Sequence, residues 1–356
     1  TSTAFGYDTT IPIEERPGWK SATVPTRERI AAAARTFLSE CAPGDAWLGG
    51  NSIPWPVIAG LLALQLLEED VLGGRLARRV LENWTPALVG CLPTSEAAQK
   101  RLIQFAYGEI PDAVLRNAGL LLDREDKAGG EVFCLFRLEP LWDARMGATL
   151  LGRLERGGLK PGSVFALGNL LLSRGVEGTA AHCAGQIPHP TEMDTHNRRL
   201  VVQCLALLLI HAPRSHWQRI WPYFVAQPDV AEEALARVVG PGEIREGGFL
   251  AAMDEEQLGD LYSWLSKRFP APTDPHVMES HYVTPRETFT DLRNSVLLHL
   301  VQRGSPAACD RLARLVDALP EQRPWLPWRL REARMKARSN AWVPPTVPEV
   351  IALFQD

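Results

Sequence analysis

The sequence predicts an all-α chain, built as an array of degenerate, HEAT-like helical repeats with little or no β structure. Apolar residues recur at helical spacing along most of the chain, and turn signals rich in glycine and proline separate the apolar segments. Only one short segment, residues 131–136, has the composition of a strand, and it could equally be the start of a helix. An ordinary helical domain would give the same pattern and remains the alternative.

Each predicted helix combines an apolar face with a nearby start or stop signal. In Arg27–Glu40, for example, Ile30, Ala34 and Phe37 share one helical face, and Pro25 lies where a helix can begin. By the same criteria we expect further helices at Val57–Glu69, Leu76–Asn83, Glu96–Phe105, Ala113–Asp123, Trp142–Arg156, Val164–Arg174, Arg198–His211, Trp217–Val225, Ala231–Val238, Glu255–Phe269, Pro285–Arg303, Pro306–Ala318 and Leu326–Arg338.

The longest apolar runs, Val57–Leu67 and Leu200–Ile210, are each about half as long as a helix that crosses a membrane. We therefore expect helices that are buried on nearly all sides, in a protein with no membrane segment. No basic and apolar leader is recognisable, and the last residues stop inside an expected helix. We expect a piece of a longer cytoplasmic protein.

The most apolar helices suggest a blurred internal repeat. Their centres have a mean spacing of about 47 residues if one further repeat lies before the last centre, at the upper end of the HEAT and armadillo range. Helix pairs of this kind bury their apolar faces by stacking on their neighbours. The centres lie near Leu64, Leu120, Leu170, Leu205 and Leu298.

Proline-rich interruptions divide the predicted array. We expect an N-terminal extension over residues 1–26 and a first helical-repeat half over residues 27–183. A loop over residues 184–197 would separate it from a second half over residues 198–356, which we expect to continue beyond this sequence.

Composition and charge exclude several classes of protein. With 46% hydrophobic and 22% charged residues, the chain has the balance of a folded protein rather than a disordered one. Its formal net charge of −4 gives no general footprint for nucleic acid or for an anionic membrane surface. The six cysteines are far apart and form no CxxC pair, so we expect reduced thiols.

No segment carries a recognisable catalytic or cofactor motif. The phosphate-binding pattern GxxxxGK[ST] and the nucleophile pattern GxSxG are both absent. The eight histidines show no HxxxH spacing, so the sequence predicts no metal, no cofactor and no catalytic residue. An enzyme with an unfamiliar site in a helical cleft remains an alternative, and it would use His281 with Asp274 or Glu279.

The clearest signal for a binding surface is a basic stretch with interleaved tryptophans near the C-terminal end. Arginine beside aromatic residues can stack on bases, which keeps a nucleic-acid-binding solenoid as a second alternative. A solvated basic helix against an acidic neighbour is the simpler explanation, and Trp325 then belongs with Leu326 and Leu330 to the packed face. The loop over residues 269–285 is a second candidate surface. The candidate partner-binding residues are Asp274 and His281 in this loop and Arg329, Arg331, Arg334 and Arg338 in the basic stretch.

Four segments carry a resemblance to a known family. They are residues 45–67, DAWLGGNSIPWPVIAGLLALQLL; residues 258–265, LGDLYSWL; residues 292–300, LRNSVLLHL; and residues 325–334, WLPWRLREAR, followed by WVPP at 342–345. In order and spacing they resemble the C-terminal helical region of bacterial NACHT-type STAND NTPases, which are linked to antiphage defence.

The resemblance implies a non-catalytic sensor or regulatory array that binds a protein ligand or a partner subunit. An upstream NTPase and an effector would then lie outside this chain, which has no Walker lysine. A curved helical array offers a concave surface for such a ligand. Nucleic acid and membrane are not the partners that the resemblance implies.

Overall fold

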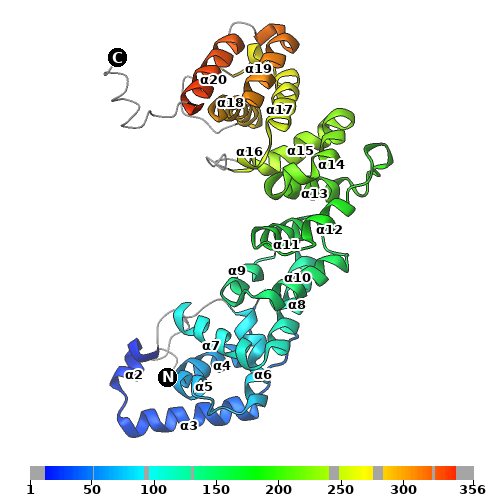
Figure 1. Cartoon of the computed structure of the whole chain (residues 1–356). Coiled ribbons are helices and arrows are strands. Elements are labelled where there is room, and N and C mark those ends of the chain that lie inside the picture. Colours follow the sequence, from blue (N-terminus) through cyan, green and yellow to red (C-terminus); the bar gives the residue numbers. More distant parts are fainter. Residues whose placement is uncertain are drawn as a thin grey trace, which may run out of the picture. The chain divides into compact units, whose positions relative to one another are not determined.

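The computed structural model contains only helices among the residues that it describes, which confirms the predicted all-α fold class (Figure 1). None of the helices in these ranges is both long and apolar enough to cross a membrane. The contacts within the chain divide it into unit 1, Thr1–Thr179, and unit 2, Ala180–Asp356. The described residues are 13–50, 52–91, 96–129, 132–239, 248–275, 284–322 and 325–341.

Unit 1 is built from helices that pack against their neighbours in sequence. Its elements are η1 (Ile13–Glu15), α2 (Pro17–Ser21), α3 (Val24–Glu40), α4 (Trp55–Leu66), α5 (Glu68–Leu72), α6 (Arg78–Gly90), α7 (Glu96–Glu109), α8 (Pro111–Ala128), α9 (Cys134–Leu138), η2 (Glu139–Leu141), α10 (Ala144–Glu155) and α11 (Pro161–Ser173). α3 contacts α4, α6 contacts both α7 and α8, and α10 contacts α11. Contacts between sequence neighbours are typical of a helical-repeat array.

Unit 2 follows the same principle. The helix α12 (Thr179–Gly185) begins at the division, and the further elements are η3 (Pro190–Glu192), α13 (Arg198–His211), α14 (Pro213–Ala226), α15 (Pro228–Val238), α16 (Phe249–Ala252), α17 (Glu255–Arg268), η4 (Ala271–Thr273), α18 (Pro285–Arg303), α19 (Pro306–Ala318), η5 (Pro320–Gln322) and α20 (Leu326–Ala341). α13 packs on α15, α17 on α18, and α20 on both α18 and α19.

Ion pairs join helices that are separated by various distances along the sequence. Six arginine–carboxylate pairs join positions 33–36 residues apart, and Arg311 and Asp260, near the C-terminal end, are 51 apart. These separations do not measure a repeat length, so the expected mean of about 47 residues stays a prediction. The six pairs are Arg35–Asp70, Arg101–Glu68, Arg145–Asp112, Arg174–Glu139, Arg198–Glu233 and Arg268–Glu232.

Several predicted boundaries shift in the structure. The expected N-terminal extension contains η1 and α2, and α3 begins at Val24 rather than Arg27. The expected loop over residues 184–197 contains the end of α12 and all of η3. The strand-like segment over residues 131–136 leads into α9, which begins at Cys134.

Among the described residues of unit 1, Trp84 on α6 is the most deeply buried aromatic side chain. It is fully buried, and its indole N–H donates to the backbone carbonyl of Leu38 at 2.9 Å. Gly60 on α4 faces the ring, and a Cβ atom at that position would lie 1.7 Å from it. The absence of a side chain at Gly60 therefore allows α4 and α6 to pack closely around the indole.

Candidate partner-binding site

The basic stretch forms α20, and one side of this helix is packed. Leu326, Leu330 and Ala333 are buried, at 0%, 9% and 0% exposure, where α20 lies against α18 and α19. Trp325, expected on the same side, is 47% exposed instead. The tryptophan precedes the first residue of the helix, so helical spacing does not apply to it.

The opposite side of α20 presents the outer face, defined here as Trp328, Arg331, Arg334, Met335 and Arg338. Steps of three and four residues between Trp328, Arg331, Met335 and Arg338 place these four on one side of a helix. Trp328 is 57% and Met335 is 71% exposed, and the three arginines are exposed as well. None of the three makes an ion pair within the described parts of the chain. The outer face therefore combines unpaired positive charge with exposed apolar surface.

Arg329 lies beside the outer face and is engaged within its own helix. Its guanidinium group lies 4.6 Å from the centre of the Trp328 ring and pairs with Glu332 at 2.8 Å. This cation–π contact orients the indole of Trp328. Of the four arginines that the sequence singled out, three thus share the outer face and the fourth supports its aromatic residue.

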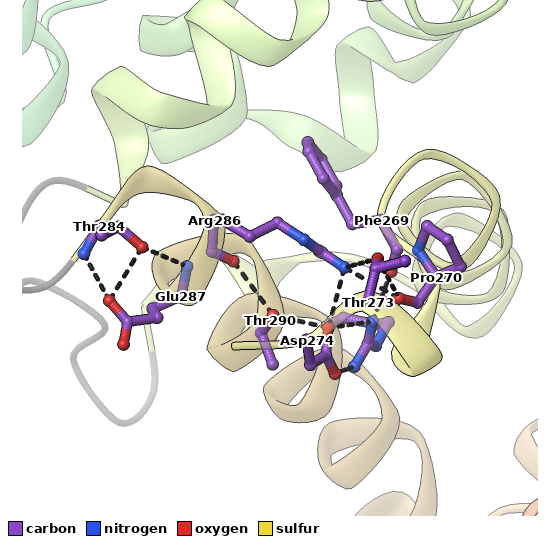
Figure 2. Close-up of polar contacts among 9 residues, drawn as sticks. Phe269, Pro270, Thr273, Asp274, Thr284, Arg286, Glu287 and Thr290 are labelled. Carbon is purple, nitrogen blue, oxygen red and sulfur yellow. Dashed lines mark hydrogen bonds and ion pairs between the residues drawn. The ribbon is translucent and has the colours of Figure 1, made fainter. Parts of the chain in front are cut away.

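Asp274, the first candidate in the proline-rich loop, is the centre of a clamp that joins the end of α17 to α18 (Figure 2). Its carboxylate accepts hydrogen bonds from Arg286 at 2.9 Å, from the Thr290 hydroxyl at 3.0 Å, and from Arg293. The Arg293 side chain is 4% exposed and that of Asp274 is 19% exposed. The hydrogen-bond partners of the Asp274 carboxylate are therefore residues of the chain itself. Its part in partner binding stays a prediction.

The two arginines of the clamp also bind the segment that follows α17. Arg293 donates to the Phe269 carbonyl at 2.5 Å, and Arg286 donates to the Pro270 carbonyl at 2.9 Å. The guanidinium carbon of Arg286 lies 5.2 Å from the centre of the Phe269 ring, and both residues are drawn in Figure 2. The Phe269 ring stacks on Phe289, with 4.6 Å between the ring centres. The clamp thus fixes the described start of the proline-rich loop.

The surroundings of Asp274 shift its acidity. Burial alone would raise the pKa of this carboxyl group, but hydrogen bonds from Arg293 and Thr290 and the positive charges of Arg293 and Arg286 outweigh it. The pKa of Asp274 is therefore lowered below its ordinary value.

We expect this clamp to weaken in acid. Because the pKa of Asp274 is lower in the folded chain, its stabilising contribution is complete above the unfolded pKa of about 3.9 and is lost as pH falls through the folded pKa. Urea unfolding at a series of pH values measures this loss. The variant Asp274→Asn should lack this part of the acid dependence, and parallel curves for the two proteins would contradict the expectation.

The described residues do not test the enzyme alternative. His281 and Glu279 lie outside the described residues, so the structure does not place them beside Asp274. Among the described residues no group of histidine, cysteine and acidic side chains could hold a metal ion.

Two members of the outer face, Trp328 and Met335, were not among the candidate residues predicted from the sequence. The signal was present, because Met335 follows Trp328 by seven residues, which is two helical turns.

No known family model matches the chain, and searches of curated proteins and of solved structures also find no match.

Proposed function

We propose that this chain is a non-catalytic helical-repeat module that senses or regulates by binding a protein ligand or a partner subunit. The observation that carries the proposal is the outer face of α20. In line with the resemblance to NACHT-type STAND NTPases, the module would control an NTPase and an effector that lie outside this chain. The six cysteines, all of which the structure describes, form no disulfide, and this supports a reducing, cytoplasmic location.

The chemistry of the outer face favours an acidic protein partner with an apolar anchor. Arg331, Arg334 and Arg338 have no carboxylate partner among the described residues, so an incoming acidic group need not displace one. Trp328 and Met335 supply apolar surface beside these charges. Tryptophan and arginine dominate the binding energy of protein interfaces, and methionine adapts to irregular surfaces.

A protein fits this face better than a nucleic acid does. The chain as a whole has a net charge of −4, and the positive charge of this face is local to α20, which has five basic residues and one acidic residue. A nucleic-acid partner would bind with an affinity that falls steeply with salt. Titration with a DNA duplex at low and high salt separates the two classes.

Reversing two charges on the outer face should abolish partner capture. We expect Arg331→Glu with Arg334→Glu to weaken binding at least tenfold, about 1.4 kcal/mol, because both arginines would face an acidic surface. The measurement is capture of purified phage proteins, presented one at a time, by the immobilised chain. The fold should be unaffected, since both side chains are exposed.

The matched control carries the same change in charge elsewhere. Arg29 on α3 and Arg79 on α6 are also exposed, and the pair Arg29→Glu with Arg79→Glu should retain full capture. Equal capture by the wild-type chain and the α20 variant would overturn the assignment of the outer face.

A further inference from the structure

A groove between α8 and α10 in unit 1 offers a second binding site. The two helices run in the same direction, because ion pairs join them near both ends. Arg145 at the start of α10 pairs with Asp112 at the start of α8, and Arg153 pairs with Asp123 further along, each at 2.5 Å. The groove has a volume of about 610 Å³, which is within the range of ligand-binding sites.

The buried side chains that line the groove are mostly apolar. Leu115, Met146 and Leu150 line it and are 7%, 0% and 2% exposed. Asn117, which also lines the groove, is 5% exposed, and its amide N–H donates to the Ala113 carbonyl at 2.8 Å. These side chains form a fixed base, so the polar character of the groove comes from its rim.

The rim has a surplus of positive charge. Its aspartates are already neutralised, because Asp112 and Asp123 hold Arg145 and Arg153, and Asp45 lies 3.3 Å from Arg124. Arg116 and Arg156 also line the groove and are exposed, and neither makes an ion pair with any residue that the structure describes. Two guanidinium groups are therefore available to an anionic ligand.

Gly119 keeps the groove open. It lies in the middle of α8 and lines the groove, and a Cβ atom placed on it would meet no atom within 4 Å. Glycine inside a helix costs about 1 kcal/mol relative to alanine. The fold has room for a side chain at this position, so packing against the rest of the chain does not require glycine. The space above Gly119 belongs to the groove.

The spacing of the two available arginines defines the ligand. The registers set by the two ion pairs place Arg116 and Arg156 seven to ten helical residues apart along the groove. At 1.5 Å per residue this is about 10–15 Å, which an extended peptide spans in three to four residues. We propose that the groove binds an extended acidic peptide segment with two carboxylates three or four residues apart. Its backbone would lie over Gly119.

Selection from a peptide library tests the proposal. Random displayed peptides of about nine residues, long enough to span the groove, are selected on the full chain and counter-selected on the variant Arg116→Glu with Arg156→Glu. We expect the enriched sequences to carry two acidic residues three or four apart. Synthetic peptides from the selection should bind the counter-selected variant at least tenfold more weakly by fluorescence polarisation. Replacing both acidic residues by glutamine should have the same effect.

A second variant blocks the groove without changing its charge. Gly119→Leu should fill the space above α8 and abolish binding of the selected peptide, while the free energy of unfolding is maintained or raised because leucine is the better helix former. Arg29→Glu with Arg79→Glu is the control for net charge, and Arg331→Glu with Arg334→Glu tests whether the peptide sits on α20 instead.

Three outcomes would overturn the proposal: no enrichment of acidic peptides, equal binding by the Gly119→Leu variant, or loss of binding only in the α20 variant. The last outcome would leave the proposed function of the outer face intact, because the two sites lie in different units.

Discussion

Replacing Asp274 by alanine is expected to lower the free energy of unfolding of unit 2 by about 3–5 kcal/mol, the range for breaking a buried ion pair from one side. The substitution leaves Arg293, which is 4% exposed, and Arg286, which is 25% exposed, without their carboxylate. It also removes one of the two acceptors of the Thr290 hydroxyl, so three groups at the junction of α17 and α18 lose their common centre. Urea unfolding of the full chain, followed by tryptophan fluorescence, measures the effect.

The control for this prediction is an ion pair on the surface. Asp229 pairs with Arg268 at 2.5 Å, but the Asp229 side chain is 72% exposed. Exposed pairs contribute about 0–1 kcal/mol, so Asp229→Ala should change the free energy of unfolding by that amount at most. A loss below 1 kcal/mol for Asp274→Ala would show that the clamp does not stabilise the junction.

Replacing Trp84 by alanine is expected to destabilise unit 1 by about 3–5 kcal/mol, because the indole is fully buried and its removal leaves a cavity between α4 and α6. The carbonyl of Leu38 also loses its hydrogen-bond donor, which costs about 1 kcal/mol more. Gly60→Ala should be destabilising as well, by about 1–3 kcal/mol, since its Cβ atom would overlap the ring of Trp84.

The double variant Trp84→Ala with Gly60→Ala tests whether the two residues stabilise unit 1 through the same contact. Once Trp84 is removed, the Cβ atom of alanine at position 60 no longer meets a ring, so the two losses should be less than additive. Gly152→Ala on α10 is the control, because a Cβ atom there meets nothing within 4 Å and should be neutral or slightly stabilising. Full additivity would mean that Gly60 and Trp84 act independently.

Capping residues, which bond to the ends of their own helix, can be recognised in the sequence. The predicted helices Pro285–Arg303 and Pro306–Ala318 match α18 and α19 in the structure. Thr284 and Glu287 form a capping box before α18, Gly304 ends it with a φ of 52°, and Ser305 caps α19. Each signal involves neighbours within a few residues, so the sequence alone contains it.

Boundaries that depend on packing were less accurate. The helix expected at Leu76–Asn83 extends in the structure over Arg78–Gly90, through Pro86. A proline normally argues against a helix interior, but the buried side of α6, with Trp84 and Leu88, holds the backbone helical. In this segment tertiary packing outweighs local propensity.

The candidate site was predicted in part. Arg331, Arg334 and Arg338 stand out in the sequence by composition, and the packing of Leu326 and Leu330 follows from helical spacing. The sequence does not show which of these arginines lack a counter-ion, because their possible partners lie on other helices. The clamp illustrates this point, since the carboxylate of Asp274 finds Arg293 nineteen residues away.

The sequence by itself determined the helical class, most of the helices and the basic character of α20, because helical periodicity and caps are local properties of the chain. Only the tertiary structure decided the burial of Asp274 among arginines and the groove above Gly119. Those features depend on which side chains meet across helices about 20–50 residues apart, and a single sequence carries no signal for such pairings.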